Sequence, residues 1–250
     1  MTTLLKKNIK QASTLLKNSK YTTAFTGAGI SVESGIPPFR GDTGLWSKYD
    51  PIVLDINYFK TNSLESWVVI KEIFYDFFGK ANPNSAHTAL AEMEEAGIIK
   101  SIITQNIDNL HQQAGSNTVY EFHGNSHTLI CTKCSTKYGI DDVNFDKLPI
   151  LCNNCGGLVK PDFIFFGEGI PTDAYQNSLE AAQNADVFLI IGTTGEIMPA
   201  SQIPYLAKEN GAKIIEINPN RSKFTDTITD IYLQGKATEV LNKILVGLIL

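Results

Sequence analysis

The first residues that could do chemistry are three glycines near the amino terminus. Gly27, Gly29 and Gly35 follow an apolar run that ends at Phe25. Glycine lets a backbone turn sharply and approach a ligand closely, and amides at the start of a following helix can face a phosphate. The spacing Gly-x-Gly-x5-Gly differs from the usual dinucleotide fingerprint, so the glycines alone are weak support for a nucleotide site. The alternative is a strand-to-helix turn that binds nothing.

The glycines lead into a rigid segment, Pro37-Pro38-Phe39-Arg40-Gly41. Proline lacks the amide hydrogen and clashes with the preceding turn, so a helix cannot continue through this segment. A phosphate-type turn followed by a loop that carries an aromatic ring and an arginine favours a dinucleotide site covered by a lid.

A polar cluster, Gln105-Asn106-Ile107-Asp108, follows a predicted strand at residues 98–104. In open α/β sheets, ligands bind in the crevice outside the carboxyl ends of the strands. Polar side chains placed there are costly to bury without a partner. The cluster therefore predicts a second part of the same binding site.

A histidine is the candidate for proton transfer, because a neutral imidazole titrates near working pH. An extended segment at residues 120–124 delivers His123 beside Gly124. His111 follows the polar cluster and is expected to pack within a helix, and His87 is expected to be a packed or capping residue. We favour His123 over His111 as the general base.

Four cysteines form two pairs, Cys131-x2-Cys134 and Cys152-x2-Cys155, separated by 17 residues. Each pair can clamp a tetrahedral zinc ion, and the spacer suits a zinc ribbon. No histidine or open position is suggested, so we predict a structural zinc bound by four thiolates.

Composition limits the possible partners and the compartment. The chain has 250 residues, a net charge of −5 and no basic cluster, so a nucleic-acid partner is not indicated. The amino terminus lacks the apolar core of a secretory signal, and the apolar runs at 187–191 and 244–250 are too short to span a bilayer. We expect a cytoplasmic protein that does not bind membranes.

The elements that must position these residues alternate between strands and helices. Predicted strands at 21–26, 98–104, 186–191, 213–217 and 231–233 alternate with helices at 3–19, 86–96, 172–184, 200–210 and from 238. This pattern predicts an α/β fold with a doubly wound, parallel, Rossmann-like sheet. We expect that domain at residues 1–41, 85–123 and 161–250, with a smaller lobe made of a helical module (42–84) and a zinc-binding module (124–160). Ser85 is the expected N-cap of the helix from 86, and the aromatic-rich helix at 63–79 is expected to pack within its own module.

Several chemistries are disfavoured. The chain has no P-loop lysine motif and no nucleophile elbow, so triphosphate hydrolysis and Ser-His-Asp catalysis are not indicated. Hydride transfer is disfavoured as well, because the glycine spacing is wrong and no acid follows about 20 residues later at the end of a second strand.

Taken together, the motifs resemble the sirtuin (Sir2) family of NAD-dependent protein deacylases. The matching segments are Gly27-Ala28-Gly29-Ile30-Ser31, Ser34-Gly35-Ile36-Pro37-x-Phe39-Arg40, Thr104-Gln105-Asn106-Ile107-Asp108, His123-Gly124, the two cysteine pairs, Phe166-Gly167-Glu168, Gly192-Thr193-Thr194 and Ile217-Asn218-Pro219. They occur in the family's order along nearly the whole chain.

The resemblance implies roles for individual residues, with NAD as a consumed co-substrate. Nucleotide contacts are implied for Gly27, Ala28, Gly29, Glu33, Phe39, Arg40, Gln105, Asn106, Asp108, Gly192, Thr193, Thr194, Asn218, Pro219, Lys236 and Ala237. The implied catalytic residues are His123, as general base, and Asn106. An acyl-lysine tunnel is implied at Val159, Phe163, Phe166 and Gly167, and a substrate peptide would pair as a strand between the two lobes.

The implied reaction begins when the acyl oxygen attacks C1′ of the nicotinamide ribose and expels nicotinamide. His123 then takes a proton from the ribose, and water completes acyl transfer to give O-acyl-ADP-ribose and free lysine. A glycohydrolase or ADP-ribosyltransferase using the same pocket is the alternative, and a non-catalytic NAD-binding protein is a further one. We expect a monomer that acts on acyl-lysine proteins or peptides.

Acyl preference depends on a Tyr-x-x-Arg pair that relatives acting on negatively charged acyl groups carry in the helical module. By position this pair falls at Lys71 and Phe74, so both the tyrosine and the arginine are missing. We therefore expect an acetyl or longer apolar acyl group, although Lys71 could in principle meet a carboxylate.

Overall fold

Strand β1 (Thr22–Thr26) lies inside a six-stranded parallel sheet with the order β3-β2-β1-β7-β8-β9. The computed structural model describes residues 2–39 and 44–249. The remaining strands of this sheet are β2 (Ile99–Thr104), β3 (Val119–Glu121), β7 (Val187–Ile191), β8 (Lys213–Asn218) and β9 (Ile231–Gln234). The predicted parallel, doubly wound sheet is confirmed.

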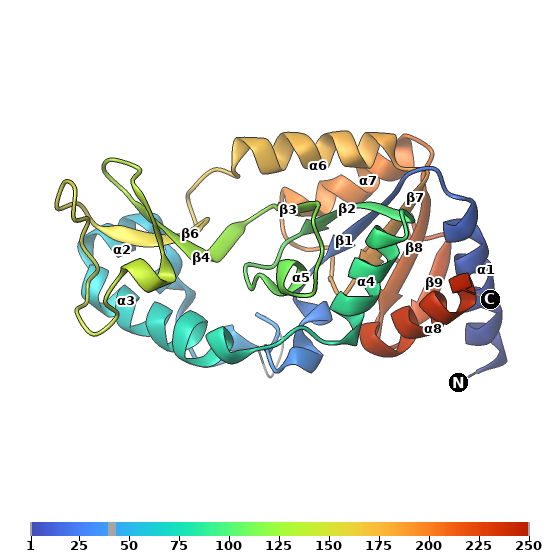
Figure 1. The fold of residues 1–250 in the computed structure, drawn as a ribbon, viewed down its shortest axis with the longest axis horizontal. Helices are drawn as coiled ribbons and strands as arrows, with labels where there is room; N and C mark the ends of the chain where they lie inside the picture. The colour runs from blue at the N-terminus through green and yellow to red at the C-terminus, as the bar shows by residue number, and fades with distance from the viewer. Residues whose placement is uncertain (1, 40–43, 250) are drawn as a thin grey trace.

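Helices cover both faces of the sheet (Figure 1). One face carries α1 (Thr3–Asn18), α4 (Ser85–Glu95) and α8 (Ala237–Ile249), and the other carries α6 (Thr172–Asn184) and α7 (Ile203–Glu209). Alternate residues of β7 enter the two cores: Leu189 and Ile191 pack with the first set of helices, and Phe188 and Ile190 with the second. Because a central parallel strand is buried on both faces, its sequence is a continuous apolar run.

A smaller lobe stands beyond the carboxyl ends of the central strands (Figure 1). It contains α2 (Ile56–Thr61), α3 (Ser63–Ile70), a π-helical turn at Lys71–Phe77, and a three-stranded antiparallel sheet. The order of that sheet is β5 (Lys137–Gly139), β4 (Gly124–Cys131) and β6 (Val159–Phe163). The short helix α5 (Leu110–Gln113) follows the polar cluster in the larger domain.

The expectation that the aromatic helical segment packs within its own module is confirmed only in part, because Trp67 contacts Phe59 of that module but also packs against the zinc-binding module. Trp67 is fully buried and its indole Nε1 donates to the carbonyl of Val159 at 2.9 Å. The ring of Phe74 packs at a tilt against that of Phe163, and both belong to a single core that joins the helical segment to the strands of the zinc-binding module. The two inserts therefore form one folded unit.

Two local expectations also differ from the structure. The helical segment does not run unbroken to residue 79, because it widens into the π-turn, where Lys71 and Asp76 pair five residues apart. The N-cap of α4 is Asn84 and not Ser85, because the Asn84 side chain accepts from the Ala86 amide at 2.9 Å. Asn84 also donates to the Ile30 carbonyl at 2.8 Å, so the cap is tied to the glycine loop.

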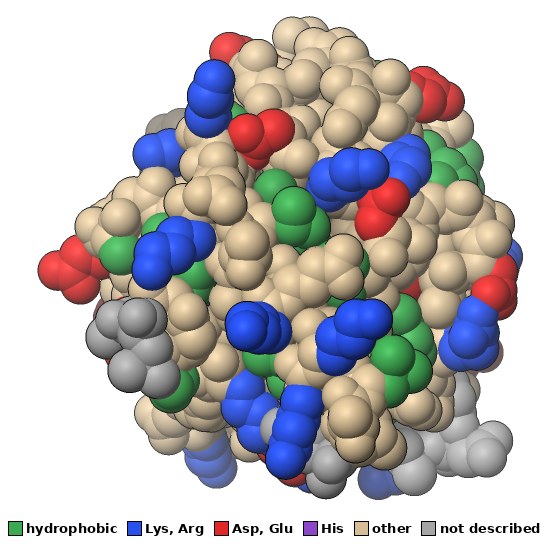
Figure 2. All heavy atoms as spheres, turned by 90° about the vertical axis from the view of Figure 1, so that its right-hand side faces the viewer, with side chains coloured by type: hydrophobic (Ala, Val, Ile, Leu, Met, Phe, Trp, Pro, Cys, Tyr) green, Lys and Arg blue, Asp and Glu red, His purple; other side chains and the backbone are tan. Residues whose placement is uncertain are grey.

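The surface of the sheet domain seen in Figure 2 carries basic side chains dispersed among polar ones, with hydrophobic atoms only in small patches. Within residues 2–39 and 44–249, no helix combines the length and the apolar character needed to cross a membrane.

Candidate functional site

The site lies where the order of the sheet reverses. From β1 the chain continues to β2 on one side of the sheet, and from β7 it continues to β8 on the other side. The loops after β1 and β7 therefore start at neighbouring strand ends and run in opposite directions. A crevice at such a topological switch point is the usual ligand site of a doubly wound sheet. The loop after β1 begins Gly27-Ala28-Gly29, and the loop after β7 begins Gly192-Thr193-Thr194. The structure thus brings together both predicted glycine segments.

The glycines serve first to let these two loops touch. The Gly29 amide donates to the Gly192 carbonyl at 2.8 Å. A Cβ on Gly29 would lie 2.6 Å from the Gly192 Cα, and a Cβ on Gly27 would lie 2.8 Å from the Thr193 Cβ. Gly192 has φ of +63°, which favours glycine. Glycine is therefore required here because the two loops touch. The residues that follow form short 3-10 turns rather than the expected helix.

The polar cluster after β2 is joined to the glycine loop by Ser31. Asn106 Nδ2 donates to Ser31 Oγ at 3.1 Å, and Ser31 Oγ donates to Asp108 Oδ2 at 2.7 Å. Gln105 Nε2 reaches the loop after β7 by donating to Thr193 Oγ1 at 3.1 Å. Burial raises the pKa of Asp108, and its hydrogen bonds, led by that from Ser31, oppose this effect. The sequence assigned no role to Ser31, yet its hydroxyl connects two residues predicted to contact the nucleotide.

His87 also contacts Ser31 at the site. The prediction of a packed or capping histidine is confirmed, because its Nδ1 accepts from the Asn84 amide at 3.3 Å and the side chain is fully buried. Nδ1 is therefore unprotonated, which places the proton on Nε2, 3.4 Å from Ser31 Oγ. Burial lowers the pKa of His87 to about 4. The ring stays neutral near pH 7 and donates toward Ser31.

His123 keeps one ring nitrogen available to accept a proton. Its Nδ1 lies 3.0 Å from the Gln105 carbonyl. Because a carbonyl only accepts, Nδ1 must carry the proton, and Nε2 keeps its lone pair. Burial lowers the pKa of His123, partly opposed by the bond to Gln105. His111 is buried, with Nε2 2.9 Å from Thr26 Oγ1, so of the two only His123 is partly exposed.

The opposite end of the crevice is built around Asn218 at the end of β8. Its Nδ2 donates to the Thr193 carbonyl at 3.1 Å and to Glu216 Oε1 at 2.9 Å. Both amide hydrogens are therefore used, and Oδ1 remains to accept from a ligand hydroxyl. Glu216 is fully buried. Pro219 follows on an exposed turn.

Glu33 and Lys236 meet across the edge of the crevice at 3.2 Å, and Thr238 also donates to Glu33. Ala237 is the first residue of α8 and is buried. Phe39 lies at the end of the described amino-terminal segment, and its ring packs at a tilt against Trp46, with 5.6 Å between the ring centres. Arg40 lies outside the described residues.

The residues predicted to line an acyl-lysine tunnel lie in two environments. Phe166 is 52% exposed, and its backbone pairs with the helical module through bonds to Leu54 and Ile56. Gly167 beside it is also exposed. Val159 and Phe163 are buried in the core of the smaller lobe. Their place in a tunnel stays a prediction.

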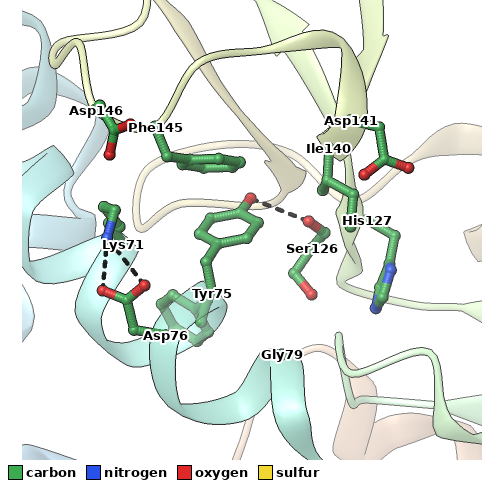
Figure 3. Close-up of a pocket in the computed structure, with 11 residues that line it drawn as sticks. Lys71, Tyr75, Asp76, Gly79, Ser126, His127, Ile140, Asp141, Phe145 and Asp146 are labelled. Atoms are coloured by element: carbon green, nitrogen blue, oxygen red, sulfur yellow. Dashed lines mark hydrogen bonds and ion pairs between the residues drawn. The ribbon is translucent and has the colours of Figure 1, made fainter.

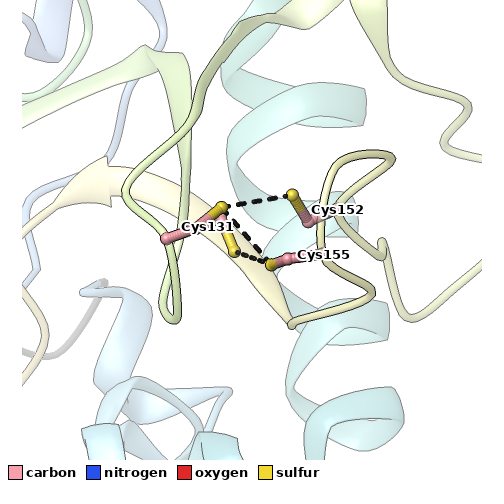
Figure 4. A group of neighbouring side chains, drawn as sticks. Cys131, Cys152 and Cys155 are labelled. Atoms are coloured by element: carbon pink, nitrogen blue, oxygen red, sulfur yellow. Dashed lines mark hydrogen bonds between the residues drawn. The ribbon is translucent and has the colours of Figure 1, made fainter.

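The four cysteines converge on one point (Figure 4). Their sulfurs all lie within 4.8 Å of one another, with Cys131 and Cys155 3.5 Å apart and Cys134 and Cys152 3.6 Å apart. Four sulfurs around zinc at about 2.3 Å from the metal would lie at nearly these separations. A Cβ on Gly157 would come within 3.1 Å of the Cys131 sulfur. The donor set and the space around it fit a closed tetrathiolate zinc site.

Comparison with known proteins gives one answer. The model of the Sir2 family matches residues 27–199. The chain belongs to the Sir2 family. It is 44% identical to NAD-dependent protein deacylase 2 of Archaeoglobus fulgidus, with 94% of each chain covered, and 41% identical to NAD-dependent protein deacetylase 1 of Pyrobaculum aerophilum, with 95% of this chain and 93% of that one covered.

Solved Sir2 structures agree. A mutant Sir2 homologue in complex with ADP ribose superimposes with a TM-score of 0.90 at 37% identity, covering 96% of both chains. Sir2 bound to an acetylated peptide superimposes with a TM-score of 0.87 at 35% identity, covering 95% of this chain and 97% of that one.

A separate cavity of about 410 Å³ lies between the helical segment and the zinc-binding module of this Sir2 fold (Figure 3). Lys71 lines it and forms an ion pair with Asp76 at 2.7 Å. Lys71 therefore already has an anionic partner. The other lining residues are Phe74, Tyr75, Gly79, Ser126, His127, Ile140, Asp141, Phe145 and Asp146.

Replacing Gly29 by alanine tests the contact between the two loops. We expect Gly29→Ala to lower the free energy of unfolding by about 1–3 kcal/mol, because the new methyl group meets backbone that cannot retreat. Gly169→Ala is the control, since nothing lies within 4 Å of a Cβ there. Urea unfolding of both variants measures the difference, and equal stabilities would contradict the steric argument.

Removing the metal tests the tetrathiolate site. We expect about one zinc ion per chain. Chelation should shift the tryptophan emission of the protein toward the red, because the core that buries Trp67 shares residues with the zinc-binding module. Metal analysis and tryptophan fluorescence measure both effects. Cys131→Ser should reproduce the shift without a chelator, whereas Ser135→Ala, an exposed neighbour, should not. A zinc-free protein with unchanged emission would refute the structural role.

Proposed function

We propose that this chain removes acyl groups from lysine side chains of proteins, with NAD as co-substrate. The products are nicotinamide, O-acyl-ADP-ribose and free lysine. The observation that carries the proposal is the bond from His123 Nδ1 to the Gln105 carbonyl, at 3.0 Å. It leaves an unprotonated Nε2 beside the polar cluster at the switch point.

In this proposal each part of the site serves one part of the reaction or of NAD. His123 Nε2 takes the ribose proton, and the Asn106 amide, held by Ser31, orients the reacting groups. Asp108 and Gln105 meet the nicotinamide end, and Asn218 accepts from a hydroxyl at the adenosine end. The loops after β1 and β7 enclose the phosphates between these ends. The sequence-derived contacts of Glu33, Phe39, Arg40, Lys236 and Ala237 belong to the same proposal.

Zinc, when bound by the four cysteines, supplies folding energy to the smaller lobe and no reactive group. The four sulfurs fill a tetrahedral zinc site and leave no open ligand position for a substrate. The site residues of the larger domain carry the chemistry.

We further propose a monomer that acts in the cytoplasm without nucleic acid or membrane. The four cysteines converge as a metal-type cluster rather than as separate disulfide pairs, which suits a reducing compartment. A net charge of −5 gives no support to a nucleic-acid partner.

His123→Ala tests the general base. We expect deacylation to fall by about 10²- to 10⁴-fold, measured as NAD-dependent release of nicotinamide and O-acyl-ADP-ribose from an acetyl-lysine peptide. His127→Ala is the control, because His127 faces the separate cavity and should leave the rate unchanged.

The pH profile of the same reaction gives a second measurement. Because the pKa of His123 is lowered, its base form persists below the ordinary histidine value of about 6.5. As pH falls through the lowered pKa, Nε2 is protonated and the rate should drop.

Full activity in His123→Ala would refute the assignment of the general base. Nicotinamide release independent of acyl peptide would indicate a glycohydrolase instead.

A panel of acyl-lysine peptides tests the acyl preference. We expect the wild-type enzyme to remove acetyl or longer apolar groups and to act poorly on succinyl-lysine, because the ammonium of Lys71 is already paired with Asp76. Robust desuccinylation with weak deacetylation by the wild type would overturn the preference.

A further inference from the structure

Lys160 is a buried ammonium that the proposed reaction does not use. The residue is 6% exposed and lies on β6, the strand that leads toward Phe166 and Gly167. Burying a charged ammonium is costly unless each of its N–H groups finds an acceptor and an opposite charge lies near. Such a residue calls for a specific role.

All three donors of the ammonium are used. Lys160 Nζ donates to the Pro161 carbonyl at 2.9 Å and to the Phe163 carbonyl at 2.7 Å, and it lies 3.0 Å from Glu168 Oε2. It also sits 4.5 Å from the centre of the Phe165 ring. The side chain therefore binds the backbone before and after the end of β6 and the carboxylate beyond it.

Glu168 binds the same stretch of backbone from its carboxyl-terminal end. Its Oε2 accepts from the Phe165 amide at 2.8 Å, in addition to facing Lys160. The pair of Lys160 and Glu168, which we name the latch, thus encloses residues 163–168, which we name the substrate segment. Without the pair, the Pro161 and Phe163 carbonyls lose their bonds to the ammonium, and the Phe165 amide loses its bond to the carboxylate.

The substrate segment connects the general base to the smaller lobe. The Ile164 amide donates to the His123 carbonyl at 2.9 Å. Two residues later, the Phe166 amide donates to the Leu54 carbonyl at 2.8 Å, and the Ile56 amide donates to the Phe166 carbonyl at 3.1 Å. The segment is therefore bonded at one end to the residue that carries the general base and at the other to the helical module, and a shift of its backbone would alter both contacts.

We infer that Lys160 and Glu168 are positioning residues that hold the substrate segment in the conformation that binds the acyl-lysine peptide. They act through the backbone of residues 163–168 and contact neither peptide nor NAD. The inference rests on the proposed function, because it concerns the affinity of that same site for its peptide. NAD binding, built on the loops of the larger domain, does not depend on the latch.

Kinetics of Lys160→Met test the latch, because methionine keeps the length and volume but lacks the charge and donors. We expect the KM for an acetyl-lysine peptide to rise at least about tenfold, because a displaced segment misplaces the peptide. The KM for NAD at saturating peptide should stay within about twofold of wild type. Hydrogen exchange at residues 163–168 should accelerate in the same variant.

Three further variants make the test specific. Lys160→Arg keeps a buried cation and should restore part of the peptide affinity. Lys137→Met is the matched control, because Lys137 pairs with Asp162 at 2.9 Å on the same sheet but is 64% exposed; it should leave both KM values unchanged. Glu168→Gln, at a position 26% exposed in its side chain, carries the test if Lys160→Met does not fold, and should raise the peptide KM in the same direction.

The outcomes separate the latch from the proposed function. A wild-type protein that removes no acyl group from any peptide would refute the function itself. Wild-type deacylation together with an unchanged peptide KM in folded Lys160→Met or Glu168→Gln would refute the latch alone. An equal rise in the KM for peptide and for NAD would also refute it, because that result describes general destabilisation.

Discussion

The hydrogen bond from the Gly29 amide to the Gly192 carbonyl is the contact on which the site depends. It joins the loops of two strands that are neighbours in the sheet but lie far apart in the sequence. Because neither loop can carry a Cβ at this point, the two backbones approach closely and fix the floor of the crevice. The hydroxyl of Ser31 and the amide of Gln105 then extend from this floor to the cluster after β2.

Backbone groups also set the protonation of the histidines at the site. An amide hydrogen from Asn84 forces His87 to keep its proton on Nε2, whereas a carbonyl from Gln105 forces His123 to keep its proton on Nδ1. One ring thus becomes a donor toward Ser31 and the other keeps a basic nitrogen. Whether each histidine donates or accepts at Nε2 is therefore decided by the kind of backbone group that its Nδ1 meets, an amide for His87 and a carbonyl for His123.

The sequence was most informative where a feature is local. The buried strands were predicted because parallel strands covered on both faces read as apolar runs, and the cysteine cluster because its spacing is fixed by metal geometry. Ser31 was missed because its partners Asn106 and Asp108 become neighbours only in the folded chain. The shared core of the smaller lobe was missed for the same reason, since Trp67 and Val159 are 92 positions apart.

The order of strands in the sheet has a consequence for biosynthesis. β1 pairs with β2 on one side, but its other neighbour, β7, ends at Ile191. A ribosome that makes the chain from its amino terminus therefore releases the whole smaller lobe before the central pair of the larger sheet can close. Until then the glycine loop has no partner at Gly192, and the nascent protein cannot assemble the floor of the crevice. Competence to bind a nucleotide is thus acquired late in translation, after the cysteine cluster has already emerged.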